Sequence, residues 1–138
     1  KGSTVNEQVH VVCPRCNTSN RVRRERLDAG AKCGSCKESL LPGEAFELTA
    51  DGFDRHVGGN DLPLVVDFWA PWYADAAAQL SPQVRLAKLN TEDEQGIAAR
   101  LGIRSIPTLI AFRGGREVAR QSGAMDLPGL LRWVRTNV

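Results

Sequence analysis

Hydrophobic and polar residues follow one another in a pattern that interleaves strands with helices through most of the chain. Residues 64–69 (LVVDFW) form a nearly continuous apolar run, typical of a strand buried on both faces. Residues 84–89 (VRLAKL) alternate in part and predict a second strand. Residues 108–112 (TLIAF) and 116–119 (REVA) flank Gly114-Gly115, which predicts a hairpin.

Two helices are expected beside these strands. Thr91 and Glu94 have the spacing of a capping box and predict a helix that ends near Leu101, with Gly102 as its stop. Residues 126–134 predict the second helix. Its apolar face would carry Leu127, Leu130, Leu131 and Val134. Strands interleaved with helices indicate an α/β domain that contains parallel strand pairs and one antiparallel hairpin.

The cysteines form two CxxC pairs, Cys13/Cys16 and Cys33/Cys36, and no cysteine follows them. A gap of two residues lets a tight turn direct both sulfurs toward one ion, and two such turns supply the ligands of a four-cysteine zinc ribbon. A segment this short buries too little apolar surface to fold without metal. We therefore expect one structural zinc ion on these four cysteines. Disulfides and a redox dithiol are the alternatives.

A turn signal at residues 41–43 (LPG) predicts a boundary between a zinc ribbon, residues 1–42, and an α/β domain, residues 43–138. The chain is 42% hydrophobic and 25% charged, as globular domains are. No apolar run approaches the roughly 20 residues that span a bilayer, and no secretory signal is recognisable. A cytoplasmic protein without a membrane partner is expected.

Positive charge is concentrated near the start of the chain, although the net charge is only +2. Residues 21–26 (RVRRER) carry four arginines that allow contact with phosphates or, alternatively, form a solvated loop. Because residues 1–42 contain no aromatic side chain for base stacking, we favour the solvated loop. A nucleic-acid partner is not expected, and neither is an oligomer. His10 and His56 have no motif around them and are assigned no metal role.

One family's motifs occur in order along the α/β part: residues 68–72 (FWAPW), 88–90 (KLN), 102–109 (GIRSIPTL), 114–115 (GG) and 122–124 (SGA). With these segments the α/β part resembles the thioredoxins, and the two CxxC pairs in front make the whole chain similar to the zinc-binding second thioredoxin of bacteria. The resemblance implies a thioredoxin fold, with a mixed central sheet flanked by helices, behind a small four-cysteine zinc ribbon. It also implies general protein-disulfide reductase activity by thiol–disulfide exchange, with disulfide-containing proteins as substrates and thioredoxin reductase as electron donor.

The sequence departs from that family directly after Trp72, where the family has the catalytic dithiol Cys-Gly-Pro-Cys. Here Tyr73-Ala74-Asp75 follows, and this segment is about ten residues shorter than in the family. Ten residues of helix span about 15 Å. Either the intact protein carries a segment that the printed sequence omits, or the deletion is real and the chain is a redox-inactive scaffold that binds partners. We favour the omission. A Trp72–Tyr73 carbon–nitrogen distance of about 1.33 Å would mark a true peptide bond.

Two residues are candidates for catalysis. Asp67 is an acid inside an apolar strand, where burial raises its pKa toward the range that suits a proton acceptor. The resemblance implies that Asp67 helps to deprotonate the resolving thiol; a buried acid satisfied by Lys88 is the structural alternative. The resemblance also implies a cis peptide bond at Pro107, facing the dithiol. An ordinary trans proline at the start of an edge strand is the alternative there.

Substrate binding is expected at Trp72, Ile106, Pro107 and Gly123. The backbone at Ile106 can pair with an extended substrate as an added strand. Trp72 offers a large amphipathic ring to a partner, and Gly123 lets a partner backbone approach closely. Core packing for Trp72 and a simple turn for Gly123 are the alternatives.

Overall fold

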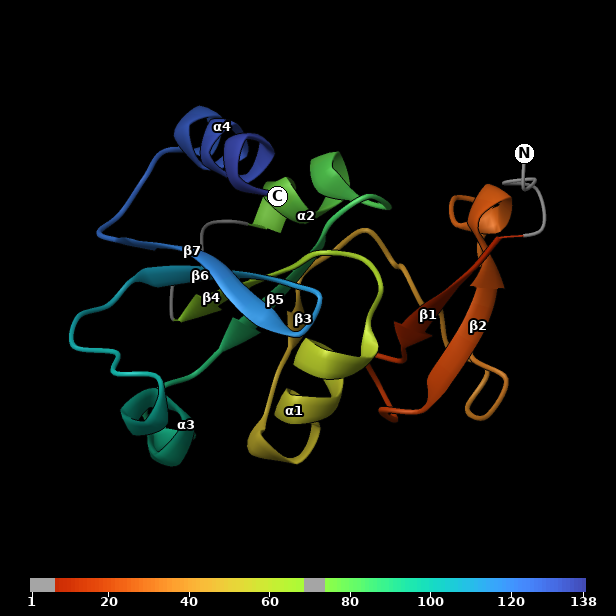
Figure 1. Ribbon diagram of the computed structural model, residues 1–138, viewed down its shortest axis with the longest axis horizontal. Coiled ribbons are helices and arrows are strands. Elements are labelled where there is room, and N and C mark those ends of the chain that lie inside the picture. The colour runs from red at the N-terminus through yellow and green to blue at the C-terminus, as the bar shows by residue number, and fades with distance from the viewer. Residues whose placement is uncertain (1–6, 69–73) are drawn as a thin grey trace.

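The central strand of the main sheet is buried along its whole length, as its apolar sequence predicts. This strand, β4 (Leu64–Phe68), pairs with β5 (Arg85–Leu89) in parallel and with β6 (Thr108–Arg113) in antiparallel orientation. Strand β3 (Phe46–Glu47) extends the sheet beside β5, and β7 (Arg116–Ser122) closes it beside β6. The computed structural model, shown in Figure 1, describes residues 7–68 and 74–138. Within these ranges the sheet is mixed, with the order β3-β5-β4-β6-β7.

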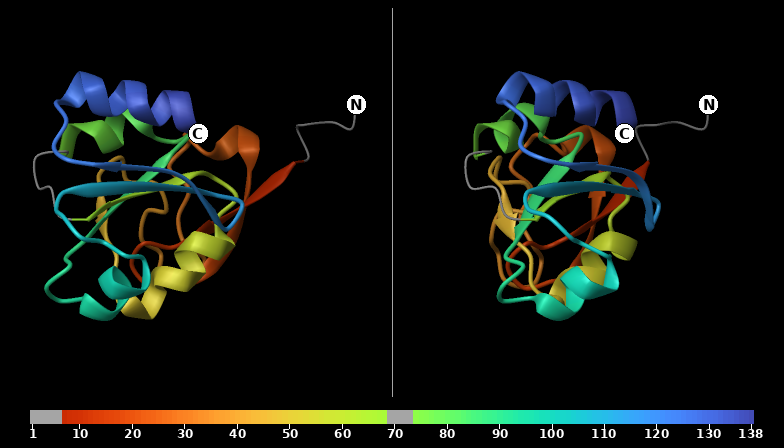
Figure 2. Two further views of the ribbon diagram at one scale, coloured as in Figure 1. Left: turned by 60° about the vertical axis from the view of Figure 1, so that its left-hand side comes forward. Right: turned by 90° about the vertical axis from the view of Figure 1, so that its left-hand side faces the viewer.

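Helices cover both faces of this sheet (Figures 1 and 2). Helices α1 (Ala50–Gly59) and α3 (Gln95–Arg100) lie on one face, and α2 (Ala74–Leu80) and α4 (Leu127–Asn137) lie on the other. Because side chains alternate along a strand, Val65 packs with the α2 and α4 layer, whereas Val66 and Phe68 pack with the α1 and α3 layer. By the same alternation, Asp67 belongs to the α2 and α4 face.

The predicted strands, the hairpin and the last helix are confirmed, but the predicted start of the middle helix is wrong. Residues 91–93 form a turn instead, because Asn90 Oδ1 accepts hydrogen bonds from the backbone N–H groups of Glu92 and Asp93, at 2.8 and 3.3 Å. Glu94 does not close a capping box either. Its Oε1 accepts from Ala50 N at 3.0 Å, at the start of α1.

The last helix begins as its sequence predicts. Asp126 Oδ1 accepts a hydrogen bond from Gly129 N at 2.9 Å, which caps α4. Leu130, Leu131 and Val134 are buried against the sheet, with Leu127 partly buried beside them. None of the described helices combines the length and the apolar character needed to cross a membrane.

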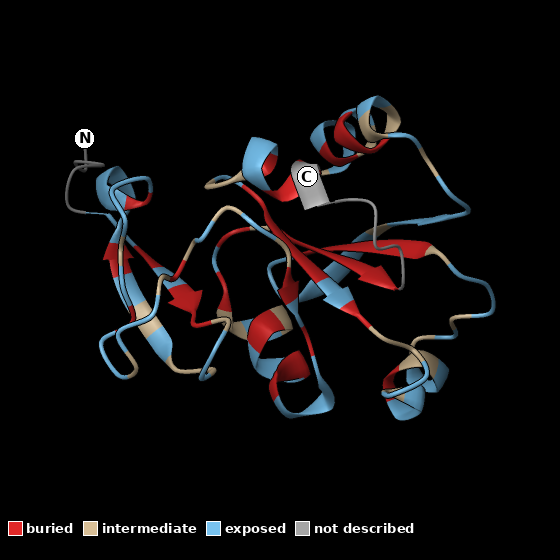
Figure 3. Cartoon of the chain, turned by 180° about the vertical axis from the view of Figure 1, so that it is seen from behind, coloured by how far each residue is buried: buried red, intermediate tan, exposed pale blue. Residues whose placement is uncertain are grey.

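The first part of the chain is a hairpin of β1 (Gln8–Val12) and β2 (Ser19–Arg23), followed by the short 3-10 helix η2 (Arg24–Arg26). It has a small core of its own. Figure 3 shows that burial is concentrated on the main sheet and is less extensive in the hairpin. Leu62, which follows α1, packs into this small core, so the two parts of the chain share buried surface. The core residues are Val9, Val11, Cys13, Val22, Leu27, Cys33, Leu40 and Leu62.

Candidate functional site

The two CxxC pairs lie in turns that repeat each other's backbone geometry. In the first turn, Asn17 N donates to Cys13 O at 3.0 Å, and Asn17 has a φ of 64°. In the second turn, Lys37 N donates to Cys33 O at 3.0 Å, and Lys37 has a φ of 70°. Left-handed backbone at the residue after each pair folds the chain back, so that both cysteines of a pair point the same way.

The four sulfur atoms meet in one cluster. All four Sγ atoms lie within 4.8 Å of one another, and the Cys13–Cys36 and Cys16–Cys33 separations are both 3.6 Å. A disulfide needs about 2.05 Å, so these cysteines are not paired as disulfides. Four thiolates around one zinc ion, each about 2.3 Å away, lie about 3.8 Å apart. The donor set and spacing therefore fit a tetrahedral metal centre.

Hydrogen bonds in the turns favour the thiolate form that a metal requires. Arg15 N donates to Cys13 Sγ, and Ser35 N donates to Cys33 Sγ, each at 3.3 Å. A backbone hydrogen bond at Cys36 is the main cause that lowers the pKa of Cys33 to about 6; burial opposes it, and Asn20 and Ser35 add to it. These bonds support negative charge on Cys33. At Cys36 a backbone hydrogen bond at Glu38 lowers the pKa, but burial and the neighbouring cysteines raise it to about 12.

A second candidate site lies at the far end of the main sheet, where Asp67 is only 2% exposed. Among the described residues its Oδ1 has no hydrogen-bond partner, and burial raises its pKa to about 7, partly opposed by the charge of Lys88. Lys88 is its neighbour across the parallel ladder, yet within residues 7–68 and 74–138 no ion pair joins the two side chains. Among the described residues, Lys88 therefore does not satisfy the buried carboxyl group as an ion-pair partner.

Pro107 lies beside this end of β4. The Ile106–Pro107 peptide bond is cis, as the resemblance implied. Pro107 O accepts a hydrogen bond from Gly123 N at 2.9 Å, and Gly123 has a φ of 95°. Ile106 is 52% exposed, which is high for a large apolar side chain.

Three strands bring these residues together. In the sheet register, Phe68 of β4 faces Thr108 of β6, which faces Ser122 of β7. Asp67 precedes the first of these residues, Pro107 precedes the second and Gly123 follows the third. Trp72 and the Trp72–Tyr73 junction lie outside the described residues. The site therefore forms at one edge of the sheet, next to the point where β4 ends.

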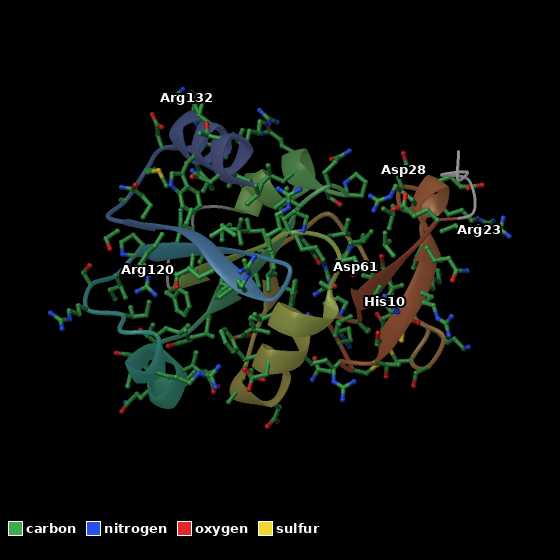
Figure 4. All side chains as sticks on the ribbon, in the orientation of Figure 1. His10, Arg23, Asp28, Asp61, Arg120 and Arg132 are labelled. Carbon is green, nitrogen blue, oxygen red and sulfur yellow. The ribbon has the colours of Figure 1, made fainter. Side chains whose placement is uncertain are left out.

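Sequence reasoning missed a buried polar network that joins the ribbon to the α/β domain. Arg85, 4% exposed, donates to Val12 O at 2.7 Å, Leu40 O at 3.2 Å and Asn60 Oδ1 at 3.0 Å. The available signal was an arginine at the start of a strand predicted to lie inside the domain. His10 lies at the surface of this junction, with its Nδ1 3.0 Å from Asp61 Oδ2 (Figure 4).

The other histidine belongs to the same junction. His56 is 1% exposed, and its Nε2 lies 3.0 Å from Asn17 Oδ1, directly after the first CxxC pair. Burial, with the charge of Arg85, lowers the pKa of His56 to about 4, so the ring is neutral near pH 7. His56 contacts the metal-site turn without belonging to the sulfur cluster.

Comparison with known families agrees with this geometry. Residues 44–136 match the thioredoxin family model, and residues 12–38 match the model of the zinc ribbon described as "Thioredoxin 2, N-terminal". The chain belongs to the thioredoxin family and carries the amino-terminal ribbon of the second thioredoxins. Its fold is the thioredoxin fold behind a four-cysteine ribbon, and disulfide reduction is the function consistent with this family.

Individual proteins support the same assignment. Thioredoxin C-3 of Corynebacterium nephridii is 37% identical, with 90% of this chain and 92% of the relative aligned. Thioredoxin of Haemophilus influenzae is 32% identical, with 69% of this chain and 98% of the relative aligned. A mutant thioredoxin from Halobacterium salinarum has a similar fold, with a TM-score of 0.60 at 24% identity over 70% of this chain and 92% of that one.

The lengths of these alignments carry further information. The alignment with the Corynebacterium protein spans 134 positions, whereas 90% of 138 residues is 124, ten fewer. The alignment with the Haemophilus protein spans 105 positions, whereas 69% of 138 is 95, again ten fewer. Both relatives thus have about ten residues that have no counterpart in the printed chain.

Proposed function

We propose that this protein reduces disulfides in other proteins, and that Ile106, Pro107 and Gly123 border a groove in which the substrate binds, next to the buried Asp67. The observation that carries the proposal is the convergence of these residues where β4 ends: an exposed Ile106, a Pro107 whose carbonyl accepts from Gly123 N, and a buried Asp67 whose Oδ1 has no partner among the described residues. An extended peptide can pair with the backbone at Ile106 as an added strand.

The proposed chemistry needs two thiols beside this groove. One thiolate attacks a substrate disulfide, forms a mixed disulfide and expels a substrate thiolate. The second thiol, once deprotonated, attacks the mixed disulfide, releases the other substrate thiolate and leaves a disulfide in the protein. Asp67, with a pKa of about 7, can accept that proton near neutral pH. A thioredoxin reductase in the cytoplasm returns two electrons.

We place both thiols in a segment of about ten residues that follows Trp72 in the intact protein. The printed sequence has no cysteine after Cys36, so it contains no dithiol at this position. The ten alignment positions without a counterpart support a segment of this length. The groove residues support it as well, because they border the end of β4 at Phe68, and such a segment would begin a few residues later, after Trp72.

We also propose that the sulfur cluster holds one zinc ion with a structural role. Cys13, Cys16, Cys33 and Cys36 complete a four-ligand shell and leave no open position for a reacting group. When bound, the ion neutralises thiolate charge and ties the two turns together.

A redox-inactive scaffold is the second candidate function, favoured by one observation: Ile106 exposes an apolar surface on a groove that the printed sequence does not supply with thiols. Such a scaffold would bind partners through the groove without chemistry. It requires that the protein encoded by the gene have the same Trp72–Tyr73 junction as the printed sequence.

Reduction of insulin disulfides separates the two functions. The protein expressed from the intact gene should reduce insulin in the presence of thioredoxin reductase, and the 138-residue chain should stay at the background rate. An intact protein with background activity would refute the reductase. Equal activity in both proteins would instead place the reacting thiols in the ribbon.

A further inference from the structure

Arg85 is a buried charged side chain that the proposed chemistry does not use. Within the part of the chain that the structure describes, its three hydrogen bonds go to two backbone carbonyls and one amide oxygen rather than to a carboxylate. The ring of Phe46 lies below its guanidinium, 4.7 Å from centroid to Cζ. Burying an arginine costs free energy unless its N–H donors are hydrogen-bonded. The acceptors of Arg85 therefore show which parts of the chain its side chain holds in place.

The two carbonyls flank the two cysteine turns. Val12 directly precedes Cys13, the first ligand of the sulfur cluster. Leu40 follows the second turn, which is closed by the bridge between Lys32 and Ser39. One guanidinium from the main sheet therefore holds the backbone beside both halves of the metal site.

Helix α1 holds the first turn from a second direction. Asn60, which caps its end, accepts from Val12 N at 2.9 Å and donates to His56 O at 2.9 Å. His56 in turn contacts Asn17, the left-handed residue that closes the first turn. Gly52 makes room for this contact, since a Cβ at that position would lie 2.6 Å from Asn17 Oδ1.

We propose that Arg85 and the glycine-lined face of α1 at Gly52 position the cysteine turns for metal binding, so that metal affinity is set partly by the thioredoxin-fold domain. None of these groups touches a sulfur atom in the described structure; they act through Val12, Leu40 and Asn17. Coupling of this kind is reciprocal, so metal binding in turn stabilises the junction. The inference rests on the proposed metal site.

Zinc affinity, measured by competition with a chromophoric chelator, tests the role of Arg85. Arg85→Leu should weaken zinc binding about tenfold or more, the effect typical of groups that orient metal ligands. Arg100→Leu is the matched control, because Arg100 also lies over a ring, 5.2 Å from the centroid of Phe53, but ion-pairs with Asp54 away from the ribbon. Its zinc affinity should equal that of the wild type.

A second pair of variants keeps the test independent of the folding of Arg85→Leu. Gly52→Ala improves helix propensity, but its Cβ would lie 2.6 Å from Asn17 Oδ1. The Asn17 side chain would have to turn away from His56, so zinc binding should also weaken. Gly58→Ala lies on the same helix with no atom within 4 Å of the added Cβ and should bind zinc like the wild type. The contrast between the two alanines isolates the contact with the turn.

The outcomes separate this inference from the metal site on which it depends. A wild-type chain that binds no zinc overturns both. A wild-type chain that binds zinc, with Gly52→Ala and Gly58→Ala equal in affinity, overturns the coupling alone. Loss of affinity in Gly52→Ala together with wild-type affinity in both controls supports the coupling.

Discussion

The ribbon and the α/β domain are stabilised in different ways. The α/β domain has two apolar clusters, one on each face of a five-stranded sheet. The ribbon has one small cluster, of which two members are metal-ligand candidates, Cys13 and Cys33, and one, Leu62, is contributed by the other domain. The α/β domain folds by burying apolar surface. The ribbon depends instead on bonds to a metal and on contacts with the α/β domain.

Removal of the metal should have the largest effect on stability, and this effect should be confined to the ribbon. Structural zinc contributes on the order of 10 kcal/mol in isolated zinc-finger peptides, more than the ribbon core can replace. Chelation, or Cys33→Ser, should abolish amide-exchange protection in β1 and β2 while β4 and β6 keep theirs. Protection in β1 and β2 that survives chelation would show that the ribbon folds without metal.

The buried Asp67 makes the stability of the α/β domain depend on pH in a predictable direction. Burial raises the pKa of Asp67 from 3.8 to about 7. Below about pH 4 the folded and unfolded states both keep the proton. As pH rises, the unfolded state ionises first, so the free energy of unfolding should fall on the order of 4 kcal/mol between about pH 4 and 7, at about 1.36 kcal/mol per pKa unit.

Urea unfolding of Asp67→Asn at several pH values checks this slope, because the amide does not titrate. The variant should lose most of the decrease. Asp54→Asn is the control, since that side chain is 80% exposed, and it should keep the wild-type slope. Identical slopes in Asp67→Asn and the wild type would show that Asp67 is already ionised in the folded state at low pH.

Truncation in the core of the α/β domain should destabilise that domain without loss of metal. Leu130 is fully buried between α4 and the sheet, so Leu130→Ala should cost about 3 kcal/mol in urea unfolding. Val118→Ala, at a side chain that is 47% exposed on β7, should cost far less. Both variants should retain zinc in the native state. Metal loss from folded Leu130→Ala would mean that the two regions are coupled through more than the junction.

Removal of a surface ion pair should have the smallest effect on stability, and the effect should be equally small in the ribbon and in the α/β domain. Arg24 pairs with Glu7 on the ribbon, and Arg120 pairs with Glu117 on β7, each at 2.8 Å. Exposed pairs contribute less than about 1 kcal/mol. Arg24→Ala and Arg120→Ala should therefore each shift the unfolding midpoint only slightly. A large loss in Arg24→Ala alone would reveal a further stabilising role in the ribbon.

Much of the fold could be predicted because periodicity reports burial directly. The apolar run at 64–69 and the glycine pair at 114–115 identify the central strand and the hairpin. Helix α1 could not be predicted, because its sequence (ADGFDRHVGG) contains three glycines and no clear apolar stripe. The helix does not start at Thr91 as predicted, because the side chain of Asn90 accepts hydrogen bonds from the backbone N–H groups of Glu92 and Asp93.

The sites were predictable to different degrees. Cysteine spacing is a local signal, so the metal cluster could be identified from four positions alone. The edge formed by Asp67, Pro107 and Gly123 depends on strand order, and only the family resemblance indicated it. Arg85 was missed because its acceptors at Val12 and Leu40 lie 73 and 45 residues away, a separation that periodicity cannot report.

The four ribbon cysteines are proposed to bind metal and to leave the redox chemistry to the other region. Thiol titration with a chromogenic disulfide, alongside metal analysis, tests this most directly in the 138-residue chain. We expect one zinc ion per chain and no fast-reacting thiol, with four thiols appearing once a chelator removes the metal. A chain that lacks zinc and shows a fast-reacting pair of thiols would contradict it.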